Sequence, residues 1–103
     1  MSSTLVTITL PTTRTDGSAL ALTDIASVVL SKNNAVVQTT PTPSTATIQF
    51  TDASPDFGST DSFSATVTDI EGNVSAAGTV SVAIPPSALA APSAPTLTAV
   101  FTA

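Results

Sequence analysis

Acidic side chains are the candidates for metal binding and for acid–base catalysis in this chain. Asp52, Asp56 and Asp61 flank one predicted loop, and three carboxylates could supply the oxygen ligands that calcium takes. Their spacing matches no recognised calcium-binding loop, so solvated loop acids are the preferred interpretation. Asp16 and Asp24 could form a carboxylate pair for acid–base catalysis, but nothing in the sequence places them together or in a cleft.

The chain also lacks the side chains that activate most catalytic sites. Its 103 residues include no His and no Cys, so the commonest general base, the commonest metal ligand and any thiolate are absent. Serine and threonine are abundant, but a hydroxyl nucleophile needs a neighbouring base. We therefore expect a protein that is not an enzyme, holds no metal and uses no cofactor.

The charge balance restricts the partners. Seven acidic residues against Arg14 and Lys32 give a formal net charge of −5. We expect no nucleic-acid partner and no membrane partner, because so few cations cannot neutralise phosphates. No apolar run approaches the length of a membrane helix. If Met1 is the natural start, the first residues lack the pattern of a signal peptide, and synthesis in a host cytoplasm is expected. Arg14 could contact a carboxylate on a partner, but a charge at a loop tip is the preferred interpretation.

Residues 63–85 predict a β-hairpin. Apolar residues alternate on both sides of a polar turn with Asp69, Gly72 and Asn73, and we expect Asp69 to hydrogen-bond the backbone of its own turn. Shorter alternating runs predict four more strands, over residues 5–10, 25–30, 35–38 and 45–50. A tight turn is predicted at residues 32–34, and residues 18–25 have room for one short helical turn.

Five or six short strands without any long helical period indicate an all-β fold of two packed antiparallel sheets. We divide the chain into a β-sandwich over residues 1–85 and a Pro/Ala-rich extended arm over residues 86–103 that ends in a candidate strand. Each strand must bury one face, which predicts a core of Val6, Ile8, Leu10, Ile25, Val28, Leu30, Ile48, Phe50, Phe63, Val67, Val80 and Val82.

Over roughly residues 5–85 the chain resembles a fibronectin type III domain. TLVTITLP is similar to the second strand of that family, TRTDGSALALTDIASVVL to the next loop and strand, and SFSATVTDIEGNVSAAGTVSVAIP to the last two strands. The buried tryptophan of the second strand is absent, and Phe63 stands where a tyrosine is expected. The resemblance implies an Ig-like (fibronectin type III-like) antiparallel β-sandwich.

The first strand of that family should precede Leu5, where only four residues stand. The segment APSAPTLTAVFTA near the other end instead resembles a Pro-rich entry followed by a first strand. A sandwich that lacks its first strand has an open edge, which readily recruits another strand. We therefore expect the arm to add a strand to a sheet through these candidate partner-binding residues: Thr96, Leu97, Thr98, Ala99, Val100 and Phe101.

Several details of the arm stay open at this stage. Residues 85–95 could span roughly 34 Å at about 3.1 Å per residue, enough to reach a neighbouring subunit or to fold back on the same domain. Either Leu97 and Ala99 or Thr98 and Val100 would face the sheet, depending on register. The alternative is a frayed tail.

Two functions fit an Ig-like domain without a catalytic set. The preferred one is a structural virion protein that decorates and stabilises the capsid or tail of a phage, since Ig-like modules are common on phage particles. Its partners would be the major capsid or tail protein and copies of itself. The alternative is a fibronectin type III-like spacer or binding module of a bacterial extracellular enzyme or adhesin. A reading frame that continues beyond Ala103 would favour the extracellular module.

Overall fold

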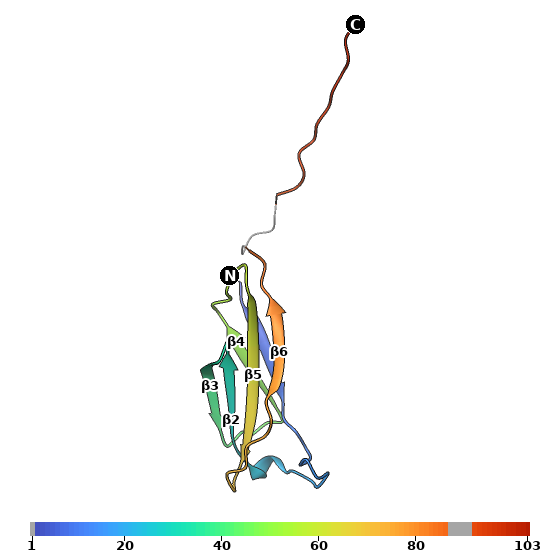
Figure 1. Cartoon of the computed structure of the whole chain (residues 1–103). Coiled ribbons are helices and arrows are strands. Elements are labelled where there is room, and N and C mark those ends of the chain that lie inside the picture. The colour runs from blue at the N-terminus through green and yellow to red at the C-terminus, as the bar shows by residue number, and fades with distance from the viewer. Residues whose placement is uncertain (1, 87–91) are drawn as a thin grey trace.

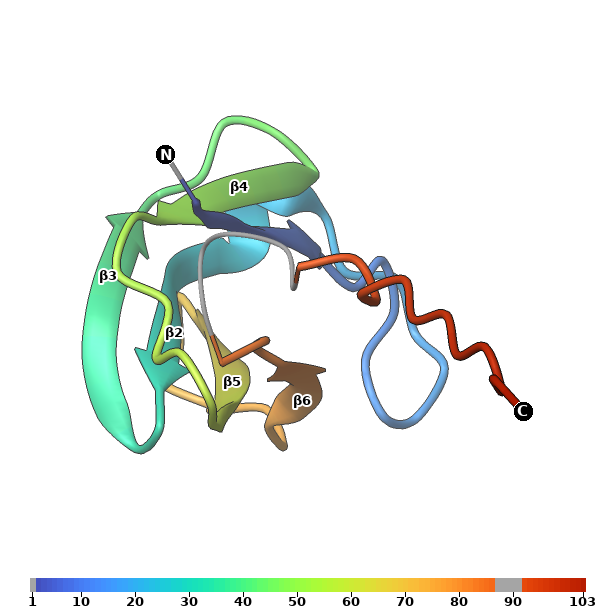
Figure 2. The same cartoon turned by 90° about the horizontal axis from the view of Figure 1, so that it is seen from above.

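A computed structural model describes residues 2–86 and 92–103, and its fold is all-β with two antiparallel sheets. One sheet pairs β1 (Thr4–Thr9) with β4 (Thr47–Asp52). The other has the order β3-β2-β5-β6 and contains β2 (Ile25–Lys32), β3 (Ala35–Pro41), β5 (Thr60–Asp69) and β6 (Gly78–Ala83). The sheets face each other, which is consistent with a β-sandwich (Figures 1 and 2).

Alternation determines which face of β1 is buried, and Pro11 determines where the strand ends. Val6 is buried and Ile8 is half-buried, whereas the alternate residues Thr7 and Thr9 are exposed. Pro11 has no N–H to give to a ladder, and β1 ends before it. The predicted inward face of this strand is therefore confirmed.

Two asparagines whose backbones are in the left-handed region connect β2 to β3. Asn33 and Asn34 have φ values of 49° and 69°, a region that asparagine tolerates better than most residues. Two consecutive residues with positive φ are the signature of the tight hairpin turn whose twist matches that of the strands. The predicted turn is confirmed, and it holds Lys32 at the end of β2.

The predicted hairpin over residues 63–85 is also present, as β5 paired with β6. β5 begins at Thr60, earlier than predicted, and β4 begins at Thr47, later than predicted. A short 3₁₀ helix, Leu22–Asp24, lies in residues 18–25, which had room for one short turn although none was predicted. Met1 and residues 87–91, which belong to the predicted arm, lie outside the described residues.

The core lies between the sheets in two adjoining clusters. One is formed by buried side chains of Leu10, Ile25, Val28 and Ile48, and the other by Val6, Leu30 and Phe63. The ring of Phe63 is 1 % exposed and is the largest fully buried side chain of the described chain. Every residue of the predicted core is buried or half-buried except Val80.

Val80 was predicted to be buried, and it is 51 % exposed. Its direction is as predicted, because Val80 pairs with Phe63 and directly opposed residues share a face of the sheet. The prediction is wrong because burial needs a cover as well as an inward direction. β6 is the outermost strand of a four-stranded sheet, and the opposite sheet has two strands.

Phe63→Ala is expected to lower the free energy of unfolding by about 3–5 kcal/mol, because it removes a buried ring and leaves a cavity. Urea unfolding followed by far-UV circular dichroism measures the change. Phe57→Ala is the matched control, since the Phe57 ring is 43 % exposed and its loss is expected to cost much less. A loss below about 1 kcal/mol for Phe63→Ala would place the ring outside the core.

Candidate functional site

The candidate partner-binding residues lie on an extended segment away from both sheets. Residues 92–103 form no strand, and Figure 1 shows them running outward from the domain. Leu97, Val100 and Phe101 are 84 %, 89 % and 91 % exposed. Three large apolar side chains on one short segment are typical of an interaction site. A frayed tail would be equally exposed, so the partner-binding role of residues 96–101 stays a prediction.

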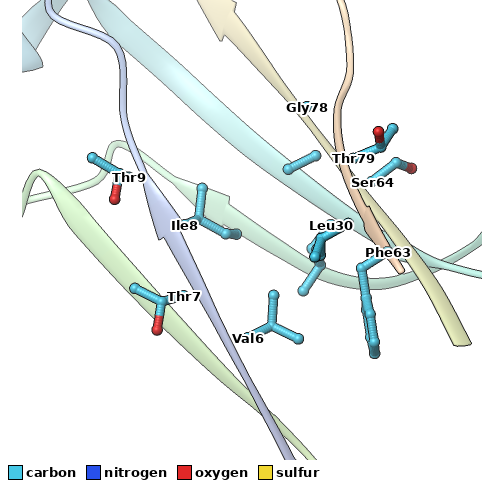
Figure 3. A pocket seen from close by; sticks show the side chains of 11 residues that line it. Val6, Thr7, Ile8, Thr9, Leu30, Phe63, Ser64, Gly78 and Thr79 are labelled. Carbon is cyan, nitrogen blue, oxygen red and sulfur yellow. The ribbon is translucent and has the colours of Figure 1, made fainter. Parts of the chain in front are cut away.

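An open groove lies between β1 and β6, where an outer strand of one sheet faces an outer strand of the other. It has a volume of about 230 Å³, and its lining includes Val6, Ile8, Leu30, Phe63, Ala65 and Val80. Figure 3 shows Val6 and Ile8 on one side of this space and Leu30 and Phe63 on the other. No lining residue is charged. Val6, Leu30 and Phe63 at its base are themselves buried, and Val80 is the large apolar side chain along the groove that is exposed, at 51 %.

The backbone of β1 borders this groove with an unpaired edge. The Leu10 N–H donates to the Ala46 carbonyl oxygen at 2.9 Å, which continues the pairing of β1 with β4. Alternate residues of an antiparallel strand bond to the same neighbour, so Leu5, Thr7 and Thr9 direct their N–H and C=O groups to the opposite side. No strand among residues 2–86 and 92–103 pairs with that side.

Three carboxylates surround Lys32 at the end of β2. Its Nζ lies 2.7 Å from Asp52 and 3.7 Å from both Asp56 and Asp61, and it donates to the Ser54 carbonyl oxygen at 2.8 Å. Asp56 is exposed, but Asp52 and Asp61 are buried. The interpretation as solvated loop acids is therefore wrong for these two. Asp52 ends β4 and Asp61 lies near the start of β5, and both segments pass the end of β2. Both carboxylates therefore pair with Lys32.

Hydrogen bonds complete this cluster. Asn33 Nδ2 donates to Asp56 at 3.3 Å and to Asp61 at 3.2 Å, and the Asp56 N–H donates to the other oxygen of Asp61 at 3.2 Å. Burial acts to raise the pKa of Asp61, but these hydrogen bonds and Lys32 outweigh it and lower the pKa. The three acids therefore hold an internal cation. In the described part of the chain, no cluster of acidic side chains is arranged to bind a metal ion.

A second ion pair lies at the opposite end of β5. Arg14 Nη1 donates to Asp69 Oδ2 at 2.7 Å. The N–H groups of Glu71 and Asn73 donate to Asp69 Oδ1 at 3.0 and 2.8 Å, which confirms that Asp69 bonds its own turn. The hydrogen bond from Arg14, followed by those from Asn73, holds the pKa of Asp69 well below its usual range. The loop-tip interpretation of Arg14 is wrong, because its loop folds over the β5–β6 turn.

The suggested carboxylate pair is not assembled. Asp16 accepts hydrogen bonds from the N–H and the hydroxyl of Ser18, at 2.9 and 2.6 Å. Asp24 accepts one from the Ala21 N–H at 3.0 Å. Each carboxylate therefore stabilises its own turn, and no hydrogen bond joins the two in the described residues.

Sequence reasoning missed two features of this site. Lys32 was assigned to a turn, although a lysine beside two asparagines at a strand end was available as a partner for the acids of residues 52–61. The groove was missed because its lining comes from four strands, whose neighbours are not apparent from alternation alone.

No family model, curated protein or solved structure matches the chain. No helix in the described ranges is long and apolar enough to cross a membrane.

Asp69→Asn is expected to reduce the loss of stability in acid. The folded-state pKa of Asp69 is depressed below its ordinary value of about 3.9, so folding favours the ionised carboxylate. That contribution is present at neutral pH and is lost as pH falls below about 4 toward the folded-state pKa. Urea unfolding at a series of pH values measures the effect. Glu71→Gln removes the same charge from an exposed neighbour and is the control for the change in net charge. An unaltered acid dependence in Asp69→Asn would contradict the assignment.

Calcium titration by calorimetry is expected to show no binding of micromolar or tighter affinity. The Lys32 ammonium lies among the carboxylates of residues 52–61, in the position that a cation would take. Protein treated with chelator before the titration is the control for metal carried through purification. A micromolar dissociation constant that is lost in Asp61→Asn would show that the cluster binds calcium after all.

Proposed function

We propose that this chain is a non-enzymatic structural protein of a phage particle, which decorates or braces the capsid or tail through contacts of its surface and arm. The observation that carries the proposal is the exposed apolar segment over residues 96–101, held away from a two-sheet domain. A protein that works by assembly needs an accessible adhesive segment on a folded body. It needs no reaction centre.

The strand order supports a fibronectin type III-like topology for this module. β1 lies beside β4 in one sheet, and β2 and β5 are central in the other. If β1 is the second strand of such a domain, the first strand would pair with the side of β1 that has no partner among the described residues. This fold is reused for many binding and structural tasks, so the function depends on the arm and the groove.

The charges support a partner that is neutral or basic. The only two basic side chains, Arg14 and Lys32, are both paired with carboxylates of the same chain. The acidic side chains that are not buried, at Asp16, Asp24, Asp56 and Glu71, give the rest of the surface a negative charge. A surface of opposite sign on a virion protein would accelerate the encounter and exclude acidic competitors.

The second candidate is a spacer or binding module of a bacterial extracellular enzyme or adhesin. One observation favours it: residues 92–103 are extended and run away from the domain, as an interdomain linker would. In that role the apolar side chains of residues 96–101 would belong to a neighbouring domain.

Mass spectrometry of particles purified from the source is expected to find the chain in stoichiometric amounts. Full-length protein carrying Leu97→Asp and Phe101→Asp is then expected to bind particles at least about tenfold more weakly than the unmodified chain, because the charges oppose burial of the segment. Cosedimentation measures the binding. Ser93→Asp places a charge on the same arm outside residues 96–101 and should bind normally. Absence from particles, or equal binding by the charged variant, would refute the proposal.

A further inference from the structure

We propose that residues 96–101 of one copy of this chain insert into the groove between β1 and β6 of a second copy and pair antiparallel with β1. The inference depends on the proposed function in one respect, that the arm is the assembling segment. It adds the identity of the partner and the position of the contact.

The receiving edge is open and unprotected. Leu5, Thr7 and Thr9 direct N–H and C=O groups away from β4, toward the groove. Proteins usually block such an edge with charged side chains, proline or a bulge. β1 contains neither a charge nor a proline over Thr4–Thr9, and its register with β4 is continuous. Its edge therefore has none of the features that usually prevent another strand from pairing with it.

The inserted segment fits the groove in pattern and chemistry. Leu97, Ala99 and Phe101 share one face of an extended strand, and every residue on that face is apolar. We assign this face to the groove, where Val80 is 51 % exposed. Neither the segment nor the groove lining carries a charge, so insertion buries apolar surface from both without desolvating an ion.

The position of the arm favours a second copy over the arm's own domain. The Pro85 carbonyl oxygen accepts the Gly58 N–H at 3.0 Å, which fixes the chain where it leaves β6. Figure 1 shows that this exit lies at the same end of the domain as the start of β1. An arm entering its own groove from there would run parallel to β1, and parallel pairs are slightly less stable. A second copy can enter from the other end and pair antiparallel.

Repetition of this contact has a defined consequence for assembly. The arm and the groove are different surfaces, so each copy offers one of each and the contact is head to tail. Such contacts produce a ring if the rotation closes and a linear array if it does not. Either product suits a protein that decorates a repeating lattice.

Cross-linking between two single-cysteine variants tests the partner. The chain has no cysteine, so introduced thiols are the only ones. Full-length Val80→Cys and Ala99→Cys are purified separately, mixed and treated with a short bismaleimide. A heterologous cross-link between residues 80 and 99 is expected in the digest by mass spectrometry. Pairing Val80→Cys with Ser93→Cys is the control, and it should give several-fold less product.

Each result of the cross-linking experiment either supports insertion into a second copy or contradicts it. A link that forms only within single chains of the Val80→Cys/Ala99→Cys double variant would show the arm in its own groove and overturn the inference. A mixed link no stronger than the Ser93→Cys control would overturn it as well. Adding Leu97→Asp and Phe101→Asp to the Ala99→Cys chain is expected to abolish the mixed link.

Amide hydrogen exchange tests which edge is used. The amides of Leu5, Thr7 and Thr9 are expected to gain protection as the concentration of the full chain rises. Protection confined to Thr79 and Ser81, which by the same alternation point away from β5, would place the segment on β6 instead. Particle binding that needs the arm without a mixed cross-link would remove this inference and leave the proposed function. A mixed cross-link in a chain absent from particles would do the reverse.

Discussion

The packing of a two-stranded sheet against a four-stranded sheet governs which side chains of this protein are buried. β1 and β4 cover the centre of the opposite sheet, so Val28, Leu30 and Phe63 lose nearly all their contact with solvent. They do not extend over β6, and Val80 on its inner face is half-exposed for that reason. The groove, the open edge of β1 and the exposure of Val80 all follow from one fact, that no further strand of the described residues extends the two-stranded sheet beside β1.

Charged side chains are few, and they are concentrated at the two ends of the domain. Lys32 at the end of β2 pairs with Asp52 at the end of β4 and Asp61 near the start of β5, and Arg14 of the first loop pairs with Asp69 at the end of β5. The chain has no cysteine, so these loops are held without disulfides. Partly buried pairs of this kind add little net stability once desolvation is counted, and their main effect here is to fix the loops.

The arm has exposed apolar side chains, and the groove has an unpaired strand edge that an extended segment could join. The segment over residues 96–101 carries exposed apolar side chains, and the groove exposes Val80 beside an edge of β1 that has no partner strand among the described residues. Both lack charges, which removes the usual electrostatic barrier to burial. A single strand would satisfy both, because the backbone edge of β1 supplies hydrogen bonds that an exposed segment otherwise makes only to water.

Local patterns predict the strands, the asparagine turn at residues 33–34 and the inward faces, because alternation and positive-φ residues act within a few positions of each other. The sequence also determined the shortage of catalytic side chains, which is a matter of composition. Contacts between distant segments set the environments of Asp61, Arg14 and Val80. Arg14 and Asp69 are 55 positions apart, and the cover over Val80 depends on how many strands the opposite sheet has. Burial and ion pairing arise between segments that local patterns do not connect, so they follow from the assembled sheets.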